Sequence, residues 1–526
     1  MTAREAGRLD LGEALELTAL ISLNDRERGR RAAMRWLRWC LDAREPTLDE
    51  TTMVEPPDLA SAAKWTAVGE DRRGGRTAGT LPRPPTRTRT CSRTRGNSNT
   101  NGSSEGSPAG MGTGPEPEVE NSRLLFKYQE INLKTAMDIA RFRSSPVGSL
   151  VPIVVADGDK EWRHSAFVPS PLPKELELKQ ATWTAVTEAS AALARLDGAA
   201  HRLPNPYLLV RPALTKEAVS TSALEGTYAA IEDVLQAELL EESELTASTA
   251  EVRNYVLAAE KGIDLIKKLP VCRRLAREVH GVLMRGSRGD HAEIGNFRRR
   301  QNWIGTRRSS PVTESLFVPP PPGDELDRGL DAWERWVNDA GIGLPSLIRV
   351  ALAHYQFETL HPFIDGNGRV GRLLIVLTLM EHGDLKIPLL NVSPFFEDAR
   401  DEYIDHLRSV SETGDFQPWV VFFAEAIQKQ SIDALEKADE LISLRDELVR
   451  VVHEQRVRGV ALRITEDLIG YPFITPTRAA VKFDVSYQAA NSAIARLVEI
   501  GILREATGGS YGRMFMSPRV LAVINR

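Results

Sequence analysis

The chain has 526 residues and a formal net charge of −5 at pH 7. This length is enough for several domains, and the acidic balance excludes a protein that binds nucleic acid through its overall charge. Cys40, Cys91 and Cys272 are scattered and odd in number, which is typical of reduced thiols. The sequence has no apolar run near the roughly 20 residues that span a bilayer, and no hydrophobic stretch follows the basic start. We therefore expect a cytoplasmic protein without a membrane span or secretory signal.

The first 120 residues divide into a helical and a low-complexity segment. Apolar residues recur at helical spacing over 11–23 and 30–43, which predicts a small helical segment of unknown role over residues 1–67. Residues 68–120 are rich in Gly, Ser, Thr, Arg and Asn and cannot offset the entropy of folding, so we expect a disordered linker. Its basic stretch, 72–95, could contact nucleic acid or an acidic partner, but a solvated linker is the simpler interpretation.

The composition of residues 121–245 is that of a folded region, and we place a second folded region over residues 246–440. Near the end of the first region the chain reads Thr221-x-x-x-Glu225-Gly226. Taken alone, this pattern fits an ordinary helix end, with the glutamate in the last turn and Gly226 as the C-terminal cap.

A hairpin is predicted over residues 295–322. Two short apolar segments, the first ending at Gly305 and the second beginning at Leu316, are joined by a turn-rich loop. An exposed edge of such a hairpin could bind an extended peptide by strand addition. A purely structural hairpin with a polyproline spacer is the alternative, and Arg298–Arg300 could be a solvated basic run.

The most informative stretch lies between two predicted helices. Apolar residues at helical spacing predict one helix over 347–360, and Pro362 favours a break directly after His361. Residues 366–368, Gly-Asn-Gly, can adopt the positive-φ conformations that turn successive N–H groups inward as an anion-binding nest. A second, mostly apolar helix over 369–382 would point its N-terminus at this nest, and a helix N-terminus itself binds anions.

These residue types suit chemistry on a nucleoside triphosphate. His361 is the candidate general base, because an imidazole titrates near neutral pH. Asp365 is a hard oxygen ligand suited to Mg²⁺, which arrives with phosphates and needs one or two protein carboxylates. The nest would hold the α- and β-phosphates of ATP. Arg369 and Arg372, three residues apart on one helix face, would neutralise the β- and γ-phosphates.

These residues have two simpler interpretations. His354 and His361 are two helical turns apart, but no Cys or third His stands near at the spacing of a zinc site. The Gly-Asn-Gly stretch could be only a turn. That interpretation does not explain why Asp365, Arg369 and Arg372 lie next to the turn, so the nucleotide site is favoured.

The whole stretch from His361 to Arg372 resembles the signature of the Fic family, HPFx[D/E]GNGRxxR, at every specified position. Typical members transfer AMP from ATP to a protein hydroxyl, with attack at the α-phosphate and pyrophosphate leaving. The spacing of the residues alone does not choose which phosphorus is attacked. The resemblance implies that the entire motif binds the nucleotide, Val370 and Gly371 included.

Other stretches resemble further elements of the same family. The pattern from Thr221 to Gly226 resembles the inhibitory motif (S/T)xxxE(G/N), in which Glu225 would pair with Arg372 and block productive ATP binding. The predicted hairpin resembles the flap that presents a target segment to the catalytic histidine. Arg400-x-x-Tyr403 resembles an element near the adenosine, which makes Tyr403 a candidate nucleotide contact, although Ile404 replaces a second tyrosine of many members.

The C-terminal region, 441–526, is read as a helical connector and a winged helix-turn-helix. Helices are predicted over 477–483 and 486–499, a strand at 501–503, and a hairpin tip at 508–513. The basic residues outnumber the acidic ones from residue 471 on, so we expect contact with DNA or a role in docking or dimerisation. Ala489, Ala490, Ile494 and Leu497 would face the core, and Tyr487, Gln488, Asn491 and Ser492 would be exposed.

The sequence thus predicts a mainly α protein with an all-helical core, a β-hairpin flap and a small C-terminal winged helix-turn-helix. The favoured function is an autoinhibited, ATP- and Mg²⁺-dependent protein adenylyltransferase that could also remove AMP. Its acceptor would be a Ser, Thr or Tyr of another protein or of the chain itself, and a homodimer is compatible with the sequence. The alternatives are an ATP-sensing DNA-binding regulator and a transferase with another nucleotide donor.

Overall fold

The computed structural model describes residues 137–157, 160–199, 205–286, 293–305, 310–507 and 512–526. The expected helical segment 1–67 and linker 68–120, with Cys40 and Cys91, lie outside the described residues. The chain divides into two units, Met1–Gly112 and Thr113–Arg526, and all described residues belong to the second. Within the described residues, no helix combines the length and apolarity needed to cross a membrane.

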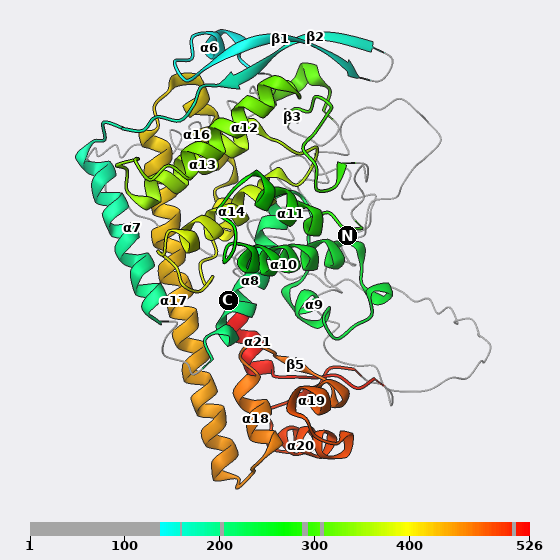
Figure 1. Ribbon diagram of the computed structural model, residues 1–526. Coiled ribbons are helices and arrows are strands. Elements are labelled where there is room, and N and C mark those ends of the chain that lie inside the picture. The colour runs from blue at the N-terminus through cyan, green and yellow to red at the C-terminus, as the bar shows by residue number, and fades with distance from the viewer. Residues whose placement is uncertain (1–136, 158–159, 200–204, 287–292, 306–309, 508–511) are drawn as a thin grey trace, which may run out of the picture. The chain divides into compact units, whose positions relative to one another are not determined.

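Two central helices, α13 and α14, carry the stretch singled out in the sequence (Figure 1). Both are buried around most of their circumference, as expected of helices in the middle of a helical body. They confirm the helices predicted over 347–360 and 369–382, except that α14 begins two residues earlier, at Asn367. The helices of this body are α7 (Gln180–Ala199), α8 (Tyr207–Leu224), α9 (Ile231–Gln236), α10 (Ala247–Leu265), α11 (Arg273–Leu283), α12 (Asp324–Val337), α13 (Ser346–Leu360), α14 (Asn367–Glu381), α15 (Ser393–Asp398), α16 (Arg400–Thr413) and α17 (Gln417–Glu454).

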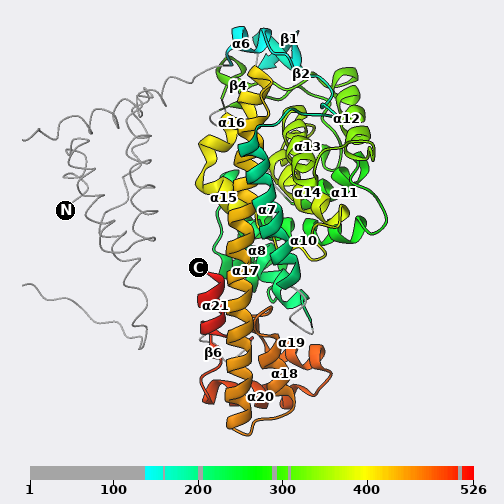
Figure 2. The ribbon, with the colours of Figure 1, turned by 90° about the vertical axis from the view of Figure 1, so that its left-hand side faces the viewer.

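The long helix α17 joins the body to the C-terminal elements. It has 38 residues and runs beside α7 in both ribbon views (Figure 2). Its first half buries Trp419, whose indole N–H donates to the Ala351 carbonyl of α13 (2.9 Å). Its second half contacts α18 (Val460–Asp467) and α21 (Pro518–Ile524). Through α17, the C-terminal elements and the central helices share one hydrophobic core.

Two antiparallel hairpins lie beside the helical body. One is a ribbon of two ten-residue strands, and the other is the short predicted hairpin, whose loop residues 306–309 are not described. The two share a small core in which the rings of Phe142, Phe167 and Phe317 meet. The carbonyl of Ser315 also accepts the N–H of Met137 (2.7 Å), so this point of the hairpin is paired within the chain. These elements are α6 (Ile139–Arg143), β1 (Gly148–Asp157), β2 (Lys160–Pro169), β3 (Ile304–Gly305) and β4 (Ser315–Phe317).

The last elements include two helices, α19 and α20, that match the predicted ones. Thr475 and Ser486 cap them by accepting the N–H of the third residue after each cap (3.1 and 3.2 Å). The strand expected at 501–503 begins only at Arg504, because the N–H groups of residues 502 and 503 both donate to the carbonyl of Leu497 and close the preceding helix. The hairpin tip expected at 508–513 lies mostly outside the described residues. The elements are β5 (Phe473–Ile474), α19 (Pro476–Phe483), α20 (Tyr487–Glu499), β6 (Arg504–Glu505) and β7 (Phe515–Met516), in sheet order β5-β7-β6.

The faces of α20 follow the expected pattern with two exceptions: Asn491, which was expected to be exposed, is half-buried, and Ala489 departs in the opposite direction. Ala490, Ile494 and Leu497 are buried, and Tyr487 is exposed, as predicted. Ala489 is exposed, although it was expected in the core. It lies at the start of the helix, where its N–H bonds to the capping serine and its side chain turns to solvent.

Candidate active site

His361 lies where α13 ends. Its backbone is left-handed (φ 46°, ψ 60°), and its N–H still donates to the carbonyl of Phe357 (3.0 Å). Its Nδ1–H donates to the carbonyl of Glu358 (3.2 Å), and because a carbonyl only accepts, this nitrogen carries the proton of the neutral ring. Nε2 is then the basic nitrogen of a side chain that lines a cleft.

The surroundings of His361 keep its ring uncharged. Burial lowers the pKa of His361 to about 4, and the nearby Arg298 guanidinium contributes in the same direction. The ring is therefore neutral at pH 7, which is the form that can accept a proton.

Arg298 corrects the interpretation of Arg298–Arg300 as a solvated basic run. Its neighbours in that run are exposed, but Arg298 is only 2% exposed, and burial lowers its pKa to about 9. Its Nε donates to the carbonyl of His361 (2.9 Å), its backbone N–H to Pro362 (2.9 Å), and its Nη2 to Pro320 (2.5 Å). Arg298 thereby ties the flap region to the turn that positions the histidine.

Two side chains shape the loop before α14. Asn367 is buried, its Oδ1 accepts the N–H of Phe363 (2.7 Å), and its Nδ2 donates to the carbonyl of the same residue (2.8 Å). His280 of α11 accepts the N–H of Gly295 at Nδ1 (3.0 Å), so its Nε2–H donates to the carbonyl of Asp365 (3.1 Å). The side chain of Asn367 is therefore structural, and only its backbone can reach a ligand.

The substitution Asn367→Ala is expected to lower the free energy of unfolding by about 2 kcal/mol, because the N–H of Phe363 loses its acceptor in a buried loop, while the carbonyl of Phe363 keeps Nδ2 of Asn302 as a donor (2.8 Å). Urea unfolding of the full chain measures this. Asn296→Ala, at an exposed position, is the control and should change stability by less than about 0.5 kcal/mol. Equal losses in the two variants would contradict the structural role of Asn367.

The N-terminus of α14 forms a cradle for an anion. Gly366 is the N-cap with a positive φ of 79°, which glycine adopts without strain. The N–H of Val370 donates to the carbonyl of Gly366 (3.0 Å) and is the first to bond within the helix. The N–H groups of Asn367, Gly368 and Arg369 precede it and remain at the helix tip, where a phosphate can accept them. Val370 therefore offers no donor to a ligand, and its side chain is buried.

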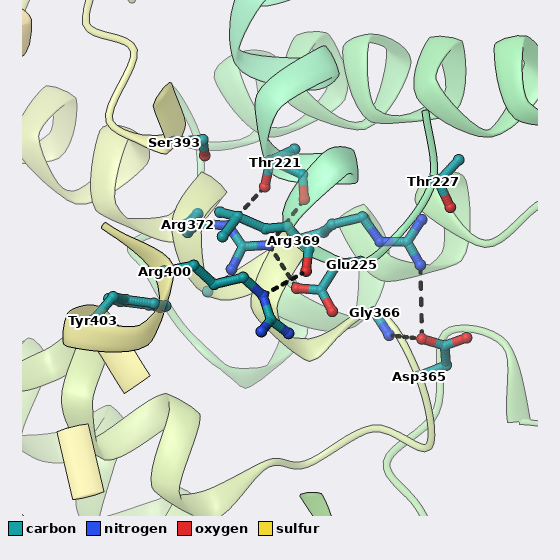
Figure 3. Close-up of polar contacts among 12 residues, drawn as sticks. Thr221, Glu225, Thr227, Asp365, Gly366, Arg369, Arg372, Ser393, Arg400 and Tyr403 are labelled. Atoms are coloured by element: carbon teal, nitrogen blue, oxygen red, sulfur yellow. Dashed lines mark hydrogen bonds and ion pairs between the residues drawn. The ribbon is translucent and has the colours of Figure 1, made fainter. Parts of the chain in front are cut away.

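Asp365 supplies one carboxylate beside this cradle. Its Oδ1 accepts the N–H of Gly366 (2.7 Å) and lies 3.7 Å from Nη2 of Arg369 (Figure 3). Mg²⁺ bound with a nucleotide needs one or two protein carboxylates, because phosphate oxygens supply other ligands, so Asp365 fits this ion in kind and number. Among the residues that the structure describes, no group of three or more His, Cys, Asp and Glu could hold a metal ion.

Arg372 is bound by the end of α8. Its Nη2 donates to Oε1 of Glu225 (2.6 Å), and its Nε donates to the hydroxyl of Thr221 (2.7 Å), as Figure 3 shows. Glu225 is the C-cap residue of α8, so it is both a helix end and an ion-pair partner. Burial raises the pKa of Glu225, but the charge and hydrogen bond of Arg372 outweigh this and hold it below its usual value. The pair is thus ionised at neutral pH.

Arg369, the other motif arginine, is also bound to a carboxylate. It is 1% exposed, and its Nη1 donates to Oε1 of Glu251 on α10 (2.5 Å). Neither Glu251 nor Arg298 was predicted to take part in the site. No local pattern distinguishes an acidic residue on an amphipathic helix, or an arginine within a basic run, from solvated neighbours.

A cleft lies beside these parts. Its walls include His361, Gly368, Glu225 and Arg372 on the polar side, and the flap and α16 supply apolar side chains. Tyr403 lines it too, but its hydroxyl is hydrogen-bonded to Nε2 of His354 (2.8 Å) and only its ring is available to a ligand. The apolar lining consists of Leu224, Ile304, Leu316, Phe317, Ile404 and Leu407.

Gly371 faces away from the cradle. A Cβ at this position would lie 2.1 Å from Oε1 of Glu358 and 3.2 Å from the ring of Phe357, so Gly371 permits close packing of α14 on α13. Asp365, Gly366 and Arg369 gather at the tip of α14, next to the cleft. The structure thus brings the predicted residues together, except that the side chains of Asn367 and Val370, and the missing side chain of Gly371, serve the fold.

Comparison with known proteins places two family domains on this chain. Residues 183–264 match the family described as Fic/DOC family N-terminal, and residues 270–379 match the Fic/DOC family. A protein adenylyltransferase Fic of Drosophila erecta is 34% identical over 167 residues, which cover 32% of this chain and 30% of the relative. Another of that name, from Drosophila ananassae, is 28% identical over 49% of this chain and 46% of its own length. The chain spans less than half the length of these relatives.

Solved structures with weaker likeness share the family name. A Fic family protein from Desulfovibrio desulfuricans G20 aligns with 65% of this chain and 97% of its own, at 19% identity and a TM-score of 0.43. Fic-1 from C. elegans (residues 134–508) aligns with 50% of this chain and 74% of its own, at 19% identity and a TM-score of 0.38.

Proposed function

We propose that this chain, with its two Fic/DOC domains, is an autoinhibited protein adenylyltransferase that moves AMP from ATP to a hydroxyl of a protein. One observation carries the proposal: His361 lines the same cleft as the ion pair of Arg372 with Glu225. A base, an anion cradle and a restrained arginine around one cavity fit regulated transfer at phosphorus. The names of the curated relatives support this reaction type.

In the proposed reaction, the acceptor hydroxyl gives its proton to Nε2 of His361 while its oxygen attacks the α-phosphorus of ATP. The bond from this phosphorus to the bridging oxygen breaks, and pyrophosphate leaves. The N–H groups at the tip of α14 hold the α- and β-phosphates, Arg369 neutralises the β-phosphate, and Arg372 neutralises the γ-phosphate. Mg²⁺ bound at Asp365 would neutralise further charge on the phosphate oxygens.

Autoinhibition follows from the competition for one guanidinium. While Arg372 is bound to Glu225 and Thr221, it cannot also bind a γ-phosphate, so ATP would bind in an unproductive position. The same carboxylate could hold a water molecule for attack on a modified hydroxyl, which would remove AMP from the target. Transfer and removal would then share one site.

The acceptor is proposed to dock along the flap. Ile304 of β3 and Leu316 and Phe317 of β4 line the cleft that contains His361, so a peptide paired with this hairpin would have its side chains close to the base. A Ser, Thr or Tyr hydroxyl of another protein, or of the chain itself, fits this arrangement.

Intact-mass measurement of the Glu225→Gly chain after incubation with ATP and Mg²⁺ tests the proposed reaction. The expected product carries one or more AMP units, and a chelator of divalent cations prevents their appearance. A product that carries phosphate alone would replace the proposal with a transferase of another group. An unmodified chain, with lysate proteins also unmodified, would refute transfer.

The pH dependence of transfer should reflect the neutral His361. Because burial lowers its pKa to about 4, kcat/KM is expected to stay level from pH 8 to about 5 and to fall only below that. The measurement is made with Glu358→Gln, because burial raises the pKa of Glu358 to about 7 and its titration would overlap. Loss of half the rate near pH 6.5 would contradict the proposed environment of the base.

A further inference from the structure

Glu251 has two hydrogen-bond donors around one oxygen. Its Oε1 accepts from Nη1 of Arg369 (2.5 Å) and from the hydroxyl of Thr227 (3.2 Å). Thr227 follows Glu225 by two residues, and its N–H donates to the carbonyl of Ser222 (2.9 Å), which closes the end of α8. Glu251 thus bridges a motif arginine and the turn after the glutamate that binds Arg372.

The guanidinium of Arg369 is oriented by this contact. It is 1% exposed, and a buried charge needs a counter-charge to remain ionised and in place. With Nη1 held by Glu251, Nη2 lies 3.7 Å from Oδ1 of Asp365 and 3.7 Å from Sδ of Met284. Nε is buried without a hydrogen-bond partner, so Glu251 makes the short contact that fixes the plane of the group.

Glu251 and Glu225 differ in their position relative to the cleft. Glu225 lines it and is 36% exposed, so an incoming phosphate can compete with it for Arg372. Glu251 is not among the residues that line the cleft, and it binds Nη1 of Arg369, whereas Asp365 lies 3.7 Å from Nη2. A phosphate at the tip of α14 would meet Nη2 of Arg369 and leave the contact with Glu251 in place.

We infer that Glu251 is a positioning residue, which holds Arg369 ready for the β-phosphate of the nucleotide. This inference rests on the proposed function. It assigns opposite effects to two carboxylates that each bind a motif arginine. Removal of Glu225 releases Arg372 for use, whereas removal of Glu251 leaves Arg369 without the partner that aims it.

The test uses the full chain with Glu225→Gly as the parent and adds Glu251→Gln, Glu251→Asp or the control Glu260→Gln. Glu260 is an exposed residue of the same helix, α10. Calorimetry measures the affinity for ADP and for AMP, because only ADP carries a β-phosphate. Glu251→Gln should weaken ADP binding roughly tenfold and leave AMP binding unchanged, since the lost contact is a charge-assisted hydrogen bond. Glu251→Asp, which keeps the charge, should restore part of the ADP affinity.

Transfer activity gives a second readout. We expect Glu251→Gln to lower kcat/KM for ATP about 100-fold, because a misplaced phosphate ligand loses its contribution to the transition state, and Glu260→Gln to leave it unchanged. Unchanged ADP affinity, an equal loss for ADP and AMP, or a gain in transfer would overturn the inference. If the parent binds both nucleotides but transfers nothing, the proposed function fails while the binding ratio still decides the role of Glu251. A parent that binds neither nucleotide overturns both.

Discussion

Replacement of His361 by alanine in the Glu225→Gly chain is expected to lower the rate of AMP transfer about 10²- to 10⁴-fold, which is the usual contribution of a general base. The side chain contributes little else, because the turn at residue 361 is held through its own backbone, whose N–H donates to Phe357 and whose carbonyl accepts from Nε of Arg298. The fold and the nucleotide affinity should therefore persist. Single-turnover rates and calorimetric titration with ATP measure the two quantities separately.

A second histidine supplies the control for this result. His453→Ala changes an exposed position on α17, far along the chain from the cleft, and should leave the transfer rate unchanged. Transfer that persists in His361→Ala with ATP affinity intact would remove the histidine as the base. Loss of both ATP affinity and transfer would instead mean that the His361 side chain supports the fold of the site.

The substitution Glu225→Gly is expected to raise the transfer rate on the order of 100-fold. Arg372 is only 2% exposed and is held by Glu225 and Thr221 at 2.6 and 2.7 Å, so in the wild-type chain it is not free for a phosphate. One electrostatic group aimed at the reacting phosphates contributes about 10²- to 10³-fold, and its release should return a gain of that size. Glycine can adopt the backbone angles of residue 225 (φ −90°, ψ 2°), which lies at the end of α8 and not in the helix interior.

Nucleotide binding shows whether the gain comes from Arg372. The wild-type chain should bind ATP and ADP with similar affinity, because Arg372 is bound to Glu225 and cannot bind the γ-phosphate. In Glu225→Gly, ATP should bind roughly tenfold more tightly than ADP, as expected for one charge-assisted hydrogen bond. Glu225→Gln keeps the shape and removes the charge, and it should give an intermediate rate. Equal transfer rates in wild type, Glu225→Gly and Glu225→Gln would mean that Glu225 only caps the helix.

The local parts of the site could be predicted from the sequence. Helical spacing before His361, a proline after it and glycines around Asn367 are signals that act over a few residues, and α13 and α14 follow them within two residues. Residue chemistry also predicted that His361, Asp365 and the two motif arginines would lie around one anion cradle.

The parts that sequence reasoning missed depend on distant segments. Arg298 binds the carbonyl of His361 across 63 positions, and Glu251 binds Arg369 across 118. The hydroxyl of Tyr403, a predicted nucleotide contact, is bonded to His354 across 49 positions. No periodicity or spacing records such contacts, because they arise only when the helices pack.

The net effect of charges in the C-terminal region also depends on distant segments and could not be predicted from the sequence. Its basic residues outnumber its acidic ones in the sequence, which predicts a surface for DNA or docking. In the structure Lys482, Arg496, Arg513, Arg519 and Arg526 each form an ion pair with a carboxylate, so the local excess of positive charge is partly compensated. Charge counted along a chain does not reveal which charges neutralise one another after folding.

Labelling with radioactive ATP tests the central claim most directly. Wild type, Glu225→Gly and Glu225→Gly/His361→Ala are incubated with Mg²⁺ and ATP that carries ³²P either at the α- or at the γ-position. We expect protein label from α-³²P-ATP alone, strongest in Glu225→Gly and absent from the double variant. Label from γ-³²P-ATP, or label that survives in the double variant, would contradict it.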